Sequence, residues 1–154
     1  MYLGIDIGTT SICAVVIRAD GGLVRSVTKP NTFGFADGAA RMQDVGGIVK
    51  MCRDMVNELC AAYPVISIGV SGQMHGILYL DDTGDPVSPL YIWQDGCGNL
   101  MMEDGETYAS YLRKTGGAAS AGFGLTTHFY LQKNGMIPET AAKMVTICDY
   151  VGMK

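Results

Sequence analysis

The sequence predicts an α/β protein in which helices pack against a layer of strands. Three observations support this class: three β-rich segments joined by tight turns open the chain, a long amphipathic segment follows them, and a short run of β-branched residues comes next. A strand meander, a crossover helix and a further strand together are typical of an α/β layer architecture.

The first segments predict an antiparallel meander. Apolar side chains alternate in the opening strand, and Asp20-Gly21-Gly22 is a strong hairpin signal between the second and third strands. We expect the strands at Tyr2 to Ile7, Ser11 to Arg18 and Leu23 to Thr28. Pro30 and the stretch Asn31 to Gly38 are expected to end the meander.

The amphipathic segment predicts a helix that starts after Asp44, a suitable N-cap, and ends before Pro64. From Val45 to Cys60, apolar residues recur at helical spacing on one face and charged residues take the other. Val65 to Val70 is rich in β-branched residues, so we expect a buried strand parallel to the first.

The remainder is less regular. We expect a hairpin of Ile77 to Leu80 with Val87 to Trp93, where Pro89 restricts the second arm to a sheet edge. We then expect a helix near Glu106 to Lys114, stopped by Gly116-Gly117, and a short helix that Thr126 or Thr127 caps and that ends at Asn134-Gly135. Three more elements are expected before the end of the chain: a helix opened by Pro138, a strand at Val145 to Ile147, and a helix capped by Asp149.

Composition excludes several classes of protein. The 154 residues include 11 basic and 15 acidic side chains, a net charge of −4, and no basic patch that would hold a nucleic acid or an anionic membrane. The five cysteines show no C-x-x-C spacing, which predicts reduced thiols. No signal peptide and no apolar run of ~20 residues is present, so we expect a cytoplasmic protein.

The first motif with chemical meaning is Gly4-Ile5-Asp6-Ile7-Gly8-Thr9-Thr10. A carboxylate at a strand end can hold Mg²⁺ through water, and the amides and hydroxyls of Gly8, Thr9 and Thr10 can cradle phosphate oxygens. The alternative is an Asp and two Thr that satisfy an ordinary turn. No Walker A or dinucleotide-binding glycine pattern is present.

The second motif, Ser71-Gly72-Gln73-Met74-His75-Gly76, directly follows a predicted strand. Ligands of open α/β sheets bind at the carboxyl ends of strands, where Gln73 and His75 can hydrogen-bond hydroxyl groups. The alternative is a tight turn with an exposed histidine.

The third motif is Trp93-Gln94-Asp95. An aromatic face beside a carboxylate suits a sugar, which has an apolar CH face and outward hydroxyls. The alternative places the chain's only tryptophan in a core gap and Asp95 at a helix cap; both interpretations can hold at once.

These three motifs, in this order, resemble the FGGY carbohydrate kinases. Residues 122–130 and 146–150 look most like the sedoheptulose kinase branch, and xylulose kinases are next. The resemblance covers nearly the whole chain and implies the actin-like, ribonuclease-H-like ATPase fold. It implies phosphorylation of a sugar hydroxyl, in a ketose such as sedoheptulose or xylulose, with ATP and Mg²⁺ as cofactors.

The resemblance also implies roles for individual residues. Asp6, Gly8, Thr9 and Thr10 would bind the cofactor, with Mg²⁺ held by Asp6 through water. The sugar-side candidates are Gln73, Met74, His75, Trp93, Asp95, Thr127 and His128. We expect residues 1–154 to be a partial amino-terminal domain, with the catalytic base, an Asp, and the adenosine pocket beyond Lys154.

One departure from the family pattern concerns Cys97, which stands where the family usually carries Arg. A thiol does not supply the fixed guanidinium fork. This departure and the expected truncation favour an alternative: a non-catalytic actin-like module that binds a sugar or a partner, or a decayed kinase remnant. The partner in this alternative is a second copy of the chain or a separate carboxy-terminal half.

Overall fold

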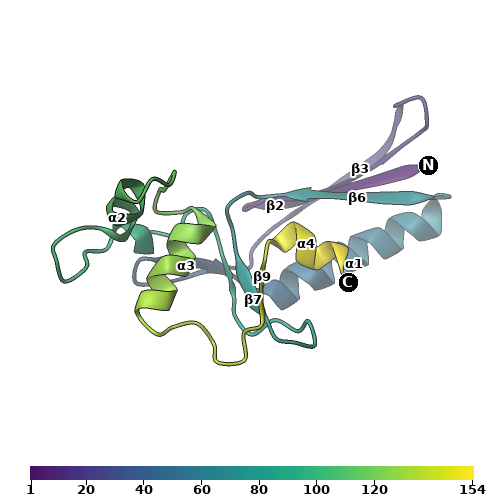
Figure 1. The fold of residues 1–154 in the computed structure, drawn as a ribbon. Helices are drawn as coiled ribbons and strands as arrows, with labels where there is room; N and C mark the ends of the chain where they lie inside the picture. Colours follow the sequence, from purple (N-terminus) through teal and green to yellow (C-terminus); the bar gives the residue numbers. More distant parts are fainter. The chain divides into compact units, whose positions relative to one another are not determined.

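A computed structural model describes all residues, 1–154, as two compact units (Figure 1). Unit 1 comprises residues 1–33, 45–73 and 147–154, and unit 2 comprises residues 34–44 and 74–146. None of the helices is both long enough and apolar enough to cross a membrane.

A four-stranded sheet forms the centre of unit 1. Its order is β3-β2-β1-β6, where the strands are β1 (Tyr2–Ile7), β2 (Ser11–Ile17), β3 (Leu23–Pro30) and β6 (Ser67–Gly72). The meander pairs antiparallel and β6 runs parallel to β1, both as predicted. Pro30 is the last residue of β3 and lies at the edge of this sheet, where a missing N–H is tolerated.

Helix α1 (Val45–Ala62) lies along this sheet, as its periodicity predicts (Figure 1). Its buried face consists of Val45, Ile48, Cys52, Met55 and Leu59, and the alternating residues of β1 and β2 are buried as well. Helix α4 (Ile147–Gly152) begins two residues before Asp149, so the prediction that Asp149 caps it is wrong.

The predicted burial of the fourth strand is also wrong. Ser67, Ile68 and Gly69 of β6 are exposed, although its parallel pairing with β1 is correct. β6 is the last strand of the sheet and has one strand neighbour, so a β-branched composition alone did not decide its burial.

Unit 2 contains short strands. One sheet has the order β4-β5-β8, from β4 (Gly34–Asp37), β5 (Ala40–Gln43) and β8 (Leu90–Tyr91), and β7 (Leu78–Leu80) pairs with β9 (Lys143–Val145). The β4–β5 hairpin was not predicted, and β4 lies in the stretch Asn31 to Gly38 that was expected only to end the meander. β8 lies at a sheet edge, as Pro89 predicts, but its ladder is with β5. Only bridges such as Ile77 to Tyr91 remain of the expected second hairpin.

The helices of unit 2 include one confirmed prediction, one correction and one short element that was not predicted. α2 (Tyr108–Lys114) is capped by Thr107 and ends before Gly116, whose φ is 96°. α3 (Gly124–Lys133) begins at a Phe123 cap, so the predicted Thr126 or Thr127 cap is wrong, although the end before Asn134-Gly135 is correct. A 3₁₀ turn, η1, covers Cys97–Asn99.

Two further predictions near the end of unit 2 are wrong. Pro138 opens a turn, closed by the Ala141 N–H donating to the Pro138 carbonyl at 2.9 Å, and no helix follows. The strand expected at 145–147 lies two residues earlier, at Lys143–Val145, because Ile147 is already the first residue of α4.

Candidate functional site

Asp6 lies near the carboxyl end of β1 with its side chain exposed. The Ser71 hydroxyl of β6 donates to Asp6 Oδ1 at 2.7 Å, because Asp6 and Ser71 are direct partners in the parallel ladder. Asp6 Oδ2 makes no hydrogen bond within the chain. An open hollow of about 350 Å³ lies beside this carboxylate and is also lined by Cys13 of β2.

The turn after Asp6 brings backbone groups close together. The Gly8 N–H donates to the Ser11 carbonyl at 2.9 Å, and a Cβ placed on Gly8 would lie 2.7 Å from that oxygen. No side chain fits at this position, so glycine is required by the close approach rather than by a special φ.

Asn31 holds this turn from beyond the meander, a role that the sequence analysis missed. Its Nδ2 donates to the Gly8 carbonyl and its backbone N–H to the Thr10 carbonyl, both at 2.9 Å. Asn31 is 8% exposed and its Oδ1 also accepts from the Phe33 N–H. An Asn just after a strand, able to form an Asx turn, is the signal that could have identified it.

Gln73 contacts the same turn. The Thr9 hydroxyl donates to Gln73 Oε1 at 3.1 Å, and the Gln73 N–H donates to the Ile7 carbonyl at 2.9 Å. The structure therefore brings Gln73, a predicted sugar-side residue, together with the predicted phosphate-side residues of unit 1.

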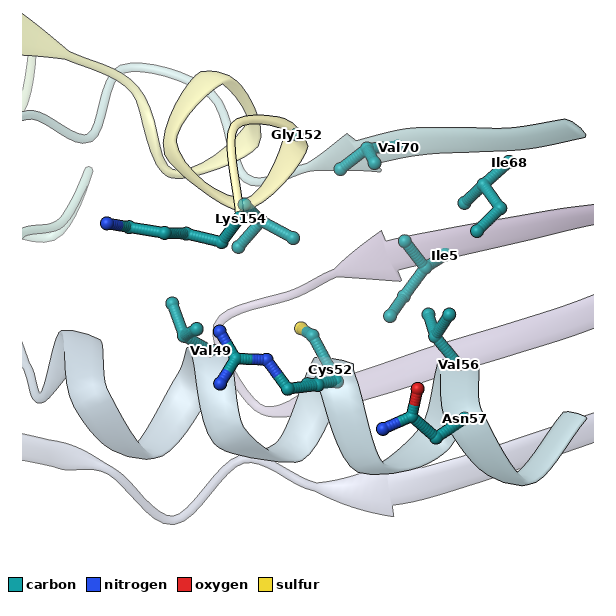
Figure 2. A pocket seen from close by; sticks show the side chains of 11 residues that line it. Ile5, Val49, Cys52, Val56, Asn57, Ile68, Val70, Gly152 and Lys154 are labelled. Carbon is teal, nitrogen blue, oxygen red and sulfur yellow. The ribbon is translucent and has the colours of Figure 1, made fainter. Parts of the chain in front are cut away.

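Unit 1 also has a hollow of about 360 Å³ that holds none of these polar site residues. Figure 2 shows its lining, which is mainly apolar and includes Ile5, Val49, Ile68 and Val70 beside Cys52 of α1.

His75 lies in unit 2, in the turn before β7. Its φ is 67°, and it is the only residue other than glycine with a positive φ. Its exposed imidazole stacks on the Phe123 ring, with centroids 4.2 Å apart and planes inclined by 10°. Met74, the residue before it, is 72% exposed.

The third motif separates its aromatic and its acidic residue. Trp93 is 49% exposed, so the interpretation that it fills a core gap is wrong. Asp95 is 2% exposed, and the Thr127 hydroxyl of α3 donates to its Oδ2 at 2.9 Å. The structure thus brings the candidates Asp95 and Thr127 together, while Asp95 Oδ1 has no hydrogen-bond partner.

Burial controls the electrostatics around Asp95. Desolvation raises the pKa of Asp95 above its ordinary value, although contacts with Thr127 and Cys97 lower it in part. Burial, together with the nearby Asp95 charge, raises the pKa of Cys97 to about 12. Cys97 is therefore a neutral thiol at physiological pH and gives this carboxylate no positive charge.

His128 is bound to a buried tyrosine. The Tyr79 hydroxyl and His128 Nδ1 lie 2.8 Å apart, and burial raises the pKa of Tyr79 to about 12. The tyrosine is therefore a neutral hydroxyl that fixes one side of the His128 ring.

The chain contains no group of three or more His, Cys, Asp or Glu side chains that could hold a metal ion directly. The residues do fit a hydrated ion, because Asp6 is exposed and its Oδ2 can accept a hydrogen bond from a metal-bound water. Mg²⁺ commonly keeps several waters and binds proteins through one or two carboxylates.

Residues 1–154 match the description "FGGY family of carbohydrate kinases, N-terminal domain". Sedoheptulokinase of Mus musculus is 33% identical over 184 residues, which include 97% of this chain and 36% of that protein. Xylulose kinase of Streptomyces coelicolor is 29% identical over 160 residues, covering 96% of this chain and 31% of that protein. The chain thus spans about a third of the length of these relatives.

Solved structures confirm the predicted fold class. Xylulose kinase from Rhodospirillum rubrum superposes with a TM-score of 0.80 at 21% identity, covering 98% of this chain and 33% of that one. Gluconate kinase from Lactobacillus acidophilus gives a TM-score of 0.81 at 22% identity, covering 97% and 32%. The match over the whole of residues 1–154 shows that the chain belongs to the FGGY family of carbohydrate kinases and corresponds to its N-terminal domain.

Proposed function

We propose that this chain is part of an ATP-dependent kinase that transfers a phosphoryl group to a hydroxyl of a ketose such as sedoheptulose or xylulose. The observation that carries the proposal is the exposed Asp6 carboxylate beside the tightly folded Gly8–Thr10 turn. Sedoheptulokinase and xylulose kinases among the relatives support the choice of a ketose.

Unit 1 supplies the phosphate-side residues in this proposal. Mg·ATP, when bound, provides the phosphoryl group that is transferred. Asp6 would accept a hydrogen bond from a water of the ion. The Gly8 N–H is bonded to the Ser11 carbonyl, so in the turn of Gly8, Thr9 and Thr10 the amides and hydroxyls of the two threonines would bind phosphate oxygens. Asn31 and Gln73 keep this turn in a single conformation, which matters because phosphoryl transfer depends mainly on positioning and charge stabilisation.

Unit 2 supplies the sugar-side residues. A sugar hydroxyl that reaches Asp95 Oδ1 would donate a hydrogen bond to it and give this buried acceptor the partner that it lacks within the chain. The half-exposed Trp93 offers a flat apolar face to the sugar CH groups. His75 supplies a second polar contact. None of these residues is proposed as the catalytic base.

A chimaeric enzyme tests the proposal. Residues 1–154 replace the matching part of mouse sedoheptulokinase, and release of ADP is measured with sedoheptulose or Mg·ATP varied in turn. His75→Ala is expected to lower kcat/KM for the sugar by about 10- to 100-fold. Asp6→Asn should instead impair the use of Mg·ATP. Asp20→Asn, at an exposed hairpin of unit 1, serves as the matched control and should change neither parameter.

The outcome that contradicts the sugar-side assignment is a His75→Ala variant with an unchanged sugar kcat/KM or a change in the ATP parameters alone. The His75 turn would then be an ordinary turn without a role in sugar binding.

A second candidate function is favoured by Cys97. Its buried, neutral thiol stands where the family pattern has a guanidinium, which suits a non-catalytic module that binds a sugar or a partner. In the chimaera, Cys97→Arg distinguishes the two: a catalytic site that lacks this contact should gain activity, whereas a module without turnover should still release no ADP.

A further inference from the structure

The backbone of His75 is held in an unfavourable region. A side chain with a Cβ is strained at φ 67°, and such a conformation persists only where the surroundings impose it. Its imidazole is exposed, so packing in the core does not hold this residue.

The loop of residues 122–124 contacts His75 in two ways. The Phe123 ring covers one face of the imidazole in a nearly parallel stack. A Cβ on Gly124 would lie 2.8 Å from the His75 carbonyl oxygen, so the loop backbone also packs directly on the turn.

The same loop reaches the other sugar-side candidates of unit 2. Gly122 packs on the Trp93 carbonyl so closely that a Cβ there would overlap it. The Phe123 carbonyl accepts the N–H groups of Thr126 and Thr127, at 2.8 and 3.0 Å, and so begins the helix from which Thr127 binds Asp95.

We propose that Phe123 is a positioning residue for sugar binding: its ring fixes the His75 imidazole in the orientation that hydrogen-bonds a sugar hydroxyl. The inference rests on the proposed function. An exposed histidine otherwise samples several rotamers, and ordering it on binding costs affinity. A flat aromatic partner restricts this motion and leaves the ring edge, where the nitrogens are, open to a ligand.

Nuclear magnetic resonance of histidine-labelled chain tests the stack. The chain has two histidines, so each imidazole signal can be assigned. In the wild type, the His75 ring protons should be shifted upfield by the Phe123 ring. Phe123→Leu should remove this shift, Phe123→Tyr should retain it, and His128, which is bound to Tyr79, should stay unchanged in both.

Titration with sedoheptulose and with xylulose then tests the positioning role. Phe123→Leu is expected to raise the sugar Kd by about 3- to 10-fold, and Phe123→Tyr to restore the wild-type value. Phe129→Leu is the matched control, because Phe129 lies on α3, the helix that Phe123 caps, but stacks on Tyr111 of α2. It should alter neither the His75 signal nor the Kd. Phe123→Met serves in place of leucine if that variant does not fold.

Each outcome bears on the inference. A wild-type His75 signal without the upfield shift, or equal sugar Kd values for wild type and a folded Phe123→Leu, overturns the positioning role alone. No sugar binding by the wild type overturns the proposed sugar site, and the positioning role falls with it.

Discussion

The two units of the chain hold their candidate residues by different means. In unit 1, Asp6 and the Gly8–Thr10 turn follow from regular strand ladders, and main-chain hydrogen bonds complete the turn. In unit 2, strands of two to four residues leave much of the site to side-chain contacts and to glycines packed on carbonyls.

Because of this difference, the stability of the two units should respond to substitutions in different ways. A regular ladder shares its stability over many backbone hydrogen bonds, so a change at one open position has little effect. The loop at 122–124 and the buried Asp95 each depend on a few close contacts. Unit 2 should therefore be more sensitive to small changes of shape, and unit 1 to loss of the hydrogen bonds that close its turn.

The largest expected effect comes from Gly122→Ala. Its methyl group would overlap the Trp93 carbonyl, so we expect a loss of more than about 3 kcal/mol in the free energy of unfolding. Gly69→Ala in β6 is the matched control, because nothing lies within 4 Å of the added methyl. It should be neutral or stabilising. Urea denaturation measures the free energy of unfolding of both glycine variants. Equal values for the two would refute the proposed difference in sensitivity between the units.

Asn31→Ala should cost about 1–3 kcal/mol, because it leaves the Gly8 carbonyl and the Phe33 N–H without their partners. Asn57→Ala, on the exposed side of α1, should change stability by less than about 0.5 kcal/mol. Thermal unfolding measures the stability of both variants, of which only Asn31→Ala removes hydrogen bonds that hold the turn. If Asn31→Ala were as mild as Asn57→Ala, the turn would not depend on Asn31.

His75 offers a test of backbone strain. His75→Gly and His75→Ala both remove the stack on Phe123, but only glycine adopts φ 67° freely. We therefore expect the glycine variant to be more stable than the alanine variant by about 1 kcal/mol, measured by urea denaturation. An alanine variant as stable as the glycine variant would show that this turn relaxes once the imidazole is gone.

The smallest expected effect is a pH dependence at Asp95. Burial raises its pKa above the ordinary 3.8, so the folded chain keeps a proton that the unfolded chain has already released. This stabilising contribution is fully present below the unfolded pKa and is lost as pH rises through the folded pKa. The Tm of Asp95→Asn should therefore rise relative to wild type with increasing pH.

Asp54→Asn gives the control of opposite sign. The hydrogen bond from Lys50 lowers the pKa of the exposed Asp54, so its contribution is present above the unfolded pKa and is lost as pH falls. A Tm difference for Asp95→Asn that did not grow with pH would mean that this carboxylate is better solvated than its 2% exposure implies.

The sequence was sufficient for most of unit 1. Alternation in β1 and β2 and the helical period of α1 coincide with the residues that are buried. The order of meander, crossover helix and strand also predicted the parallel pairing of β1 with β6, although partners such as Asp6 and Ser71 are 65 residues apart. The sequence was not sufficient for unit 2, where β7 pairs with β9 more than 60 residues later and no local pattern encodes that partner.

The same limit applies to the site. Asp95 and Thr127 were both predicted as candidates, but their hydrogen bond across 32 residues was not. Asn31 and Phe123 had no predicted role, because their contacts with Gly8 and His75 join segments that no periodicity connects. Local motifs supplied the candidate residues, and long-range packing decided what holds them in place.

The reactivity of the buried cysteines can report when each unit of the chain unfolds. Cys52 lies in the core of unit 1 and Cys97 in that of unit 2, at 2% and 4% exposure. Burial keeps both thiols protonated, because it raises their pKa values to about 11 and 12. An alkylating reagent should therefore modify the exposed Cys60 first and reach each buried sulfur only when its own unit opens. Mass spectrometry of the labelled chain would thus time the opening of the two units separately, without any engineered probe.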